Sequence, residues 1–142
     1  MSMKNSFLIL LLSGIAMIGC KTEQMNPSGI TDVETFKVAI FYPNGEEATF
    51  DMDYYEQKHM PMVAGFISDN LKYYEIDQGI SGRTSDDKPP FVAIGYFFIN
   101  DINDYNQAIA ANREAIIGDF KNYTNIQPVI QINKIKRVGS IE

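Results

Sequence analysis

The sequence predicts an α+β fold of the ferredoxin-like type, with the element order strand, helix, strand, strand, helix, strand (βαββαβ). Three observations support this prediction: four β-prone stretches bounded by turn residues, two helical stretches that each begin at an aspartate, and a strand, 91–99, that is apolar throughout. Two right-handed strand–helix–strand crossovers give a four-stranded antiparallel sheet with both helices on one face.

The N-terminal segment, 1–19, is expected to be a signal peptide and not part of this fold. Lys4 precedes an apolar run, 7–18, that is too short to span a membrane as a helix. The sole cysteine, Cys20, follows a glycine, and this arrangement resembles the acylation site of a bacterial lipoprotein. It predicts lipid on Cys20 and a place in the bacterial cell envelope, as a periplasmic or outer-membrane lipoprotein. Cleavage elsewhere, or an uncleaved anchor, is the alternative.

The next segment, 20–35, is polar and contains Pro27 and Gly29, so we expect a tether between the lipid and the domain. The remaining 36–142 suits one compact domain. Because the chain has a formal net charge of −6, an anionic membrane surface is not an expected partner. Membrane attachment is therefore predicted to come from the N-terminal lipid alone.

The first strand is predicted at 36–42, where the turn residues Pro43-Asn44-Gly45 end it. The first helix is predicted over 51–69 and begins at Asp51, whose carboxylate can accept a bond from a first-turn amide. Pro61 lacks an amide hydrogen, so we expect a kink or break there, with Pro61 in a first turn if the helix restarts. Residues spaced by three or four form one core-facing side of this helix: Met52, Tyr55, His59, Val63 and Phe66.

Further strands are predicted at 71–80, 91–99 and 129–138, with the second helix over 101–117 and Gly118 ending it. A strand with one solvated face would alternate, so 91–99 is expected to be covered on both faces. The helices of a small domain cover only one face of its sheet. The other face is therefore predicted to meet the same sheet of a second copy, which gives a homodimer.

The composition excludes several function classes. Apart from 134–137, no cluster of Lys and Arg occurs, so nucleic acid is not an expected partner. One histidine and one cysteine provide too few donors for a zinc or iron site, and the acidic pairs lack the spacing of a calcium loop. We expect no metal. No glycine-rich phosphate loop or Gly-x-Ser-x-Gly motif is present, so no cofactor is expected.

His59, the single histidine, is the candidate reactive group. It points toward the core one helical turn after Tyr55, beside the expected helix break. One interpretation is an acid/base or hydrogen-bonding group at the edge of an apolar cleft. The other is a core histidine held by a backbone carbonyl, which the lack of an evident second titratable partner favours.

Three motifs carry a resemblance to a known family: Tyr42-Pro43-Asn44, Phe50-Asp51-x-Asp53-Tyr54-Tyr55 and His59-Met60-Pro61-Met62-Val63. They resemble the EthD family, named for a protein linked to ethyl tert-butyl ether degradation, and the likeness extends over about 36–138. The resemblance implies a dimeric α+β barrel with a cleft between sheet and helices. In such barrels the cleft often binds small aromatic or lactone-like molecules and supports cofactor-free isomerisation, oxygenation or decarboxylation.

The resemblance also implies site residues. His59 matches the family's His-x-Pro histidine and is expected to line the cleft, with Tyr55 sharing a proton or a ligand contact with it. Tyr42, Asn122 and Thr124 are expected near the cleft from topology. Two hypotheses follow: an enzyme that uses His59 as acid/base on a small apolar or aromatic molecule, or a non-catalytic ligand-binding or structural module of the cell envelope.

Overall fold

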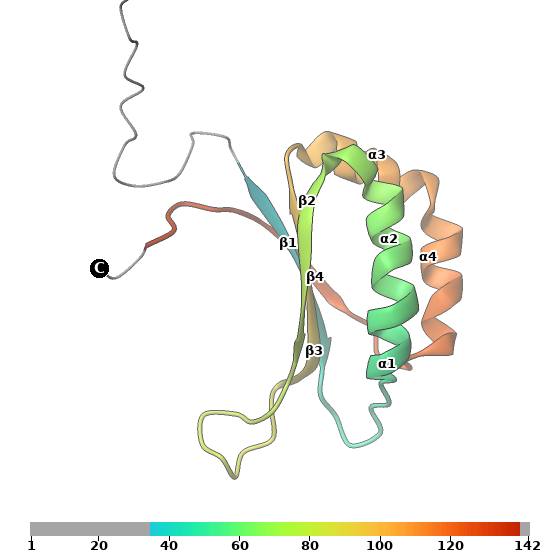
Figure 1. Ribbon diagram of the computed structural model, residues 1–142. Coiled ribbons are helices and arrows are strands. Elements are labelled where there is room, and N and C mark those ends of the chain that lie inside the picture. Colours follow the sequence, from blue (N-terminus) through green and yellow to red (C-terminus); the bar gives the residue numbers. More distant parts are fainter. Residues whose placement is uncertain (1–34, 140–142) are drawn as a thin grey trace, which may run out of the picture.

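The computed structural model describes residues 35–139, which form one sheet with a layer of helices on one side of it (Figure 1). The strands lie in the order β2-β3-β1-β4, and every neighbouring pair is antiparallel. Their bounds are β1 (Phe36–Pro43), β2 (Leu71–Gln78), β3 (Phe91–Ile99) and β4 (Val129–Lys134). The predicted ferredoxin-like α+β fold is confirmed.

The first helical stretch is continuous: α1 (Met52–Tyr54), a π-helical segment (Tyr55–His59) and α2 (Met60–Ile67), followed by the 3-10 turn Ser68–Asn70. Asp51 caps it as expected, its Oδ1 accepting from the Tyr54 amide at 3.0 Å. Of the kink or break predicted at Pro61, the break does not occur, because Met60 keeps helical angles and its N–H donates to the carbonyl of Tyr55. The wider π turn accommodates the proline, which occupies the first turn of α2 as expected.

The second helical stretch is α3 (Ile102–Ala111), α4 (Arg113–Asp119) and the 3-10 turn Phe120–Asn122. Asp101 caps α3, with Oδ1 accepting from the Asp104 amide at 2.9 Å. The expectation of one helix ended by Gly118 is wrong in two respects. The helix breaks at Asn112, whose side chain donates to the Ala108 carbonyl at 2.8 Å, and α4 continues through Gly118.

The core lies between the sheet and the helices. Alternate residues of β1 and β3 face it, and α2 covers it from the other side. Its largest fully buried side chains are Tyr42, Tyr55, Phe97, Met60, Ile99 and Val38. Because aromatic rings dominate one end of this core, their hydroxyls and the single imidazole have to find partners there.

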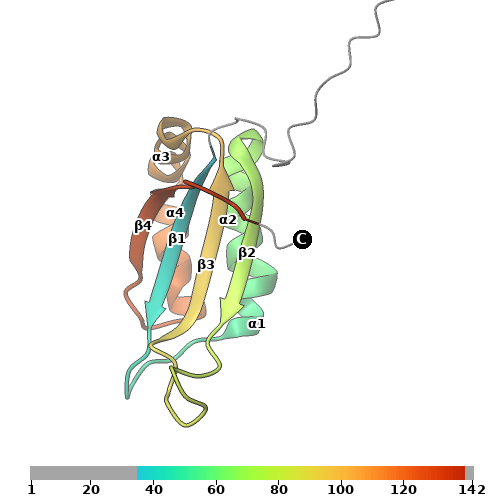
Figure 2. The same cartoon turned by 90° about the vertical axis from the view of Figure 1, so that its left-hand side faces the viewer.

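Figure 2 faces the side of the sheet that no helix covers. This face is mixed: the Phe98 ring, 7% exposed, stacks on Tyr73 with 4.1 Å between ring centres, and the Lys37 ammonium lies 5.0 Å from the centre of the Tyr96 ring. The chain after β4 leaves the sheet on this side, and its residues 135–137 line an open pocket together with Lys37 and Tyr96. The surface expected to meet a second copy is therefore bordered by the chain's own C-terminal segment.

Candidate functional site

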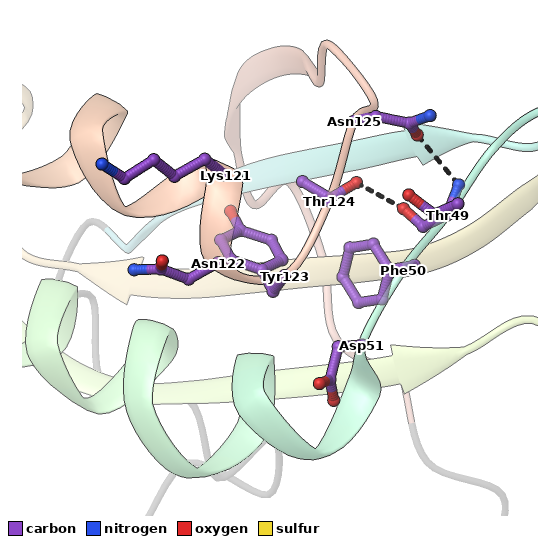
Figure 3. A pocket seen from close by; sticks show the side chains of 8 residues that line it. All are labelled: Thr49, Phe50, Asp51, Lys121, Asn122, Tyr123, Thr124 and Asn125. Atoms are coloured by element: carbon purple, nitrogen blue, oxygen red, sulfur yellow. Dashed lines mark hydrogen bonds between the residues drawn. The ribbon is translucent and has the colours of Figure 1, made fainter.

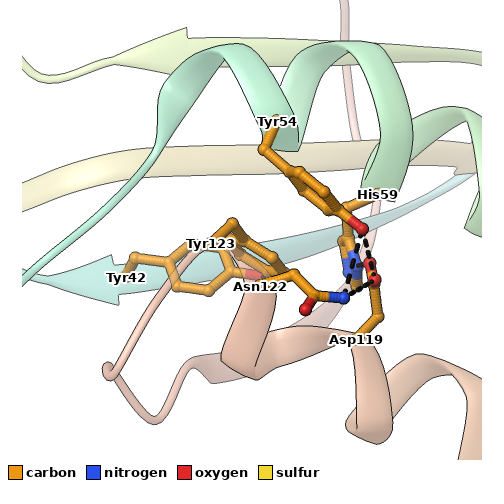
Figure 4. Close-up of polar contacts among 6 residues, drawn as sticks. All are labelled: Tyr42, Tyr54, His59, Asp119, Asn122 and Tyr123. Carbon is orange, nitrogen blue, oxygen red and sulfur yellow. Dashed lines mark hydrogen bonds and ion pairs between the residues drawn. The ribbon is translucent and has the colours of Figure 1, made fainter.

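His59 pairs with Asp119, a carboxylate 60 residues further along the chain. His59 Nδ1 lies 2.8 Å from Asp119 Oδ2, and the two side chains are 5% and 13% exposed. The π-helical segment supplies the histidine, while the last residue of α4 supplies the aspartate (Figure 4). The interpretation of His59 as a core histidine held by a backbone carbonyl is thus wrong, because its hydrogen-bond partner is the Asp119 side chain. This aspartate is a second titratable group beside the histidine.

Two further side chains hold Asp119 in place. Its Oδ1 accepts from Tyr54 Oη and from Asn122 Nδ2, each at 2.8 Å, and Asn122 Nδ2 also lies 3.2 Å from the tyrosine oxygen. Figure 4 shows these groups converging on the carboxylate from the first helix and from the turn after α4. With both oxygens engaged, the carboxylate has a fixed orientation toward the imidazole.

The electrostatics of the pair follow from burial and hydrogen bonding. Burial lowers the pKa of His59 below its ordinary 6.5, and the Asp119 carboxylate opposes this without reversing it. Burial raises the pKa of Asp119, but hydrogen bonds from His59, Asn122 and Tyr54 outweigh it and leave that pKa below its ordinary 3.8. At neutral pH the pair is therefore a neutral imidazole beside an ionised carboxylate.

This charge state fixes the tautomer of His59. An ionised carboxylate has no proton to donate, so Nδ1 must carry the hydrogen and Nε2 the lone pair. Nε2 has no hydrogen-bond partner among residues 35–139. It is also not one of the fully buried atoms without a partner, so part of its surface is accessible. The site thus presents a neutral, accessible base held by a carboxylate.

The His59 ring lines a cavity of about 70 Å³ between the sheet and the helices. Tyr42 and Tyr55 contribute the other polar side chains of the lining, and the remainder is apolar: Ile40, Met60, Val63, Phe97, Tyr105 by its ring, Ile109, Ile116, Phe120, Pro128 and Ile130. The cleft expected beside His59 is therefore present, and its walls suit an apolar molecule with few polar groups.

Tyr55 occupies the floor of this site. Its ring stacks on the His59 ring with 5.6 Å between ring centres and 17° between planes, and the residue is 0% exposed. Its hydroxyl is the one buried side-chain nitrogen or oxygen without a hydrogen bond among the described residues. Burial, with a further contribution from the nearby Tyr42 hydroxyl, strongly raises its pKa, so it remains protonated. No hydrogen bond joins the Tyr55 hydroxyl to the His59 ring, so the expected proton sharing between them has no direct path.

Gly95 makes room for this hydroxyl. A Cβ there would collide with Tyr55 Oη and lie 3.3 Å from Met60. We expect Gly95→Ala to reduce the free energy of unfolding by about 1–3 kcal/mol in urea titrations, because the buried tyrosine has no space to retreat. Gly65→Ala is the matched control: it is exposed on α2 with nothing within 4 Å, and should gain about 0.5–1 kcal/mol. Equal effects at both positions would contradict the close fit.

The other expected cleft residues divide between two places. Tyr42 lines the cavity, and its hydroxyl is paired with Tyr123 Oη at 2.9 Å. Asn122 does not line the cavity but holds Asp119. Thr124 lies away from His59: its hydroxyl donates to the Thr49 carbonyl at 2.8 Å, on an open surface depression shown in Figure 3. Its role there is to join two loops.

Sequence reasoning missed Asp119 and Tyr54. Asp119 lies beyond the predicted end of the second helix, and no periodicity links it to His59. The helical spacing selects Tyr55 and not its neighbour Tyr54. In the structure, the Tyr54 hydroxyl donates to Asp119. A local signal does exist in the spacing of Asp119 and Asn122. Side chains three residues apart on a helical turn are neighbours, and here Asn122 donates to Asp119.

Other predicted features lie outside the site. Cys20 and the rest of 1–34 fall outside the described residues. Within 35–139, no three His, Cys, Asp or Glu side chains are close enough together to hold a metal ion. No helix in that part of the chain has the length and hydropathy needed to cross a membrane.

Comparisons with known proteins agree with this fold. No family model and no curated protein matches the sequence. Among solved structures, an ethyl tert-butyl ether (EthD) family protein from Bacillus halodurans C-125 has the same fold at 15% identity, with a TM-score of 0.52 over 70% of this chain and 96% of that chain. An EthD-like protein from Ralstonia eutropha JMP134 is 36% identical, with a TM-score of 0.70 over 73% of this chain and 96% of its own. The chain thus belongs to the EthD-like protein family.

Proposed function

We propose that this protein catalyses proton transfer, without a cofactor, on a small apolar or aromatic molecule that binds in the cavity beside His59. The observation that carries the proposal is the 2.8 Å pair of His59 and Asp119 in the wall of an apolar cavity. A buried carboxylate that orients a neutral imidazole is a common arrangement for a general base. Isomerisation is the simplest reaction of this kind.

In the proposed reaction, His59 Nε2 removes a proton from a carbon that lies between a carbonyl group and a carbon–carbon double bond. The electron pair of that C–H bond moves toward the carbonyl oxygen, and the imidazolium that forms is stabilised by the Asp119 carboxylate. The Tyr55 hydroxyl is protonated and buried beside the Tyr42 hydroxyl, so it donates a hydrogen bond to the developing oxyanion once the bound molecule has uncovered it. The imidazolium then returns the proton to the far carbon of that double bond, which moves the double bond into conjugation with the carbonyl group and restores the neutral base.

The test uses deuterium uptake, because proton abstraction leaves a label even when no net reaction is visible. Small unsaturated ketones and lactones are incubated with the full-length chain in D₂O and followed by NMR. We expect His59→Ala to slow exchange of the responding compound by about 10²–10⁴-fold, and Asp119→Asn to slow it by a smaller factor. Gln57→Ala, an exposed change in the same π segment, serves as the control and should match the wild type.

Two results would remove the catalytic proposal. One is exchange at the wild-type rate in His59→Ala. The other is a full panel that exchanges no faster than in buffer, which would favour the alternative of a non-catalytic binding or structural module. The volume of about 70 Å³ is the observation that favours this alternative, because an engineered cavity that binds benzene measures about 150 Å³.

The proposal includes a homodimer joined through the open face of the sheet. Half-buried apolar side chains of β3 support it: Val92, Ile94 and Tyr96 lie on that face beside Phe98. Sedimentation equilibrium at micromolar concentration should give the mass of two chains, and a single-chain mass would contradict it.

We also propose that lipid on Cys20 anchors the protein in a bacterial cell envelope, which mass spectrometry of the membrane-extracted protein can test directly.

A further inference from the structure

The cavity is closed on one side and thinly covered on the other. Its inner wall comes from β1, β3 and the first helix, whose contributing residues are buried, as Phe97 and Val63 illustrate. Its outer wall comes from α3, α4, the turn after α4 and the start of β4, where the contributing residues other than the buried Tyr105 are only partly buried or exposed. A path from solvent to His59 is therefore shortest on the α4 side.

The edge strand β4 leaves this side open. Ile130 pairs with Ile40 and shares its core-facing side of the sheet, yet it is 57% exposed while lining the cavity. Ile132, two residues further on the same side, is 38% exposed. Apolar side chains on the inner face of a sheet remain exposed only where no helix lies close over them. The helical layer thus stops short of β4.

Helix α4 is the weakest wall of the cavity. None of its side chains is buried, and it is separated from α3 by the break at Asn112. Ile116 is its contribution to the lining, and Asp119 at its end makes its strongest polar contacts. Core walls resist displacement because they are close-packed, whereas a helix without buried residues moves at lower cost.

We propose that ligands enter between β4 and α4, and that Ile116 and Ile130 set the size of molecule that reaches His59. This inference rests on the ligand cleft of the proposed function and adds its entrance and its size limit. A ring the size of benzene needs more room than the cavity of about 70 Å³ provides, so binding requires the part of α4 around Ile116 to move outward while Asp119 at its end keeps its hydrogen bond to His59. Shortening Ile116 supplies that room without movement, and enlarging Ile130 obstructs the path.

The size limit is tested with benzene and naphthalene, using the NMR signals of the single His59 ring of the full-length chain as reporter. We expect Ile116→Ala to tighten naphthalene binding about tenfold relative to benzene. Ile117→Ala is the matched control: it is the next residue of the same helix, 49% exposed, and does not line the cavity. The control should leave the ratio of the two affinities unchanged.

The entrance is tested by exchange rates. Ile130→Trp should slow benzene association about tenfold, measured from the line shapes of the His59 signals, whereas Ile132→Trp on the same strand and face should not. If benzene binds but these substitutions leave affinities and rates at wild-type values, the entrance lies elsewhere, while the proposed cleft stands. If neither probe shifts the His59 signals in the wild type or in Ile116→Ala, both the entrance and the ligand cleft are wrong.

Discussion

Acidification from pH 7 to pH 5 should destabilise this protein through His59. The folded-state pKa of His59 lies below its unfolded value of about 6.5, so below that pH the unfolded chain takes up a proton that the folded chain does not. The stabilisation is fully present above pH 6.5 and is lost as the pH falls toward the folded pKa. The expected slope reaches at most about 1.4 kcal/mol per pH unit for one proton.

Urea titrations at intervals between pH 7.5 and 5 measure this slope, and the chain's single histidine makes it assignable. His59→Gln should flatten it. Asp119→Asn removes the charge that supports the imidazolium, so the His59 pKa, followed by NMR, should fall further. The ordinary pKa of Asp119, 3.8, places its own contribution at lower pH, where it is lost as the carboxylate protonates. A protein that is as stable at pH 5 as at pH 7 would mean that His59 is charged in the folded state.

The fold could be predicted from the sequence because its signals are local. Strand composition, turn residues and the two aspartate caps fix where elements begin, and the crossover rule then leaves few topologies. The errors occur where the backbone has a second solution. Pro61 can be accommodated by a π turn as well as by a break, and Asn112 interrupts a helix that the apolar spacing continues to Ile117.

The candidate site was only half predictable for the same reason. Helical spacing places Tyr55 and His59 on the inner face, and both are buried there. Asp119 becomes their neighbour only after α4 packs beside the first helix, so no pattern within either segment reveals the pair. Thr124 is expected near the cleft from topology alone, which does not specify where a loop side chain points, and its hydroxyl donates to the Thr49 carbonyl outside the cavity lining.

Tyr55→Phe should stabilise the protein by about 1–3 kcal/mol while impairing the proposed reaction. A buried hydroxyl without a hydrogen bond carries the cost of its lost hydration, and phenylalanine keeps the ring packing while removing that cost. The same change removes the proposed donor to the oxyanion, which should slow deuterium exchange by about 10²–10³-fold. A gain in stability with a loss of turnover separates a functional group from a structural one.

Tyr42→Phe provides the contrast, because it removes a hydroxyl of the same kind from the same cavity. The Tyr42 hydroxyl is bonded to Tyr123 Oη, so its loss leaves a buried partner unpaired and should cost about 1–3 kcal/mol in urea titrations. The two substitutions should thus change stability with opposite signs. If Tyr55→Phe destabilises as Tyr42→Phe does, the Tyr55 hydroxyl already has a hydrogen-bonding partner, such as an ordered water, in the free protein. A ligand oxygen would then have to displace that partner, and the assignment of Tyr55 as a ready donor would fail.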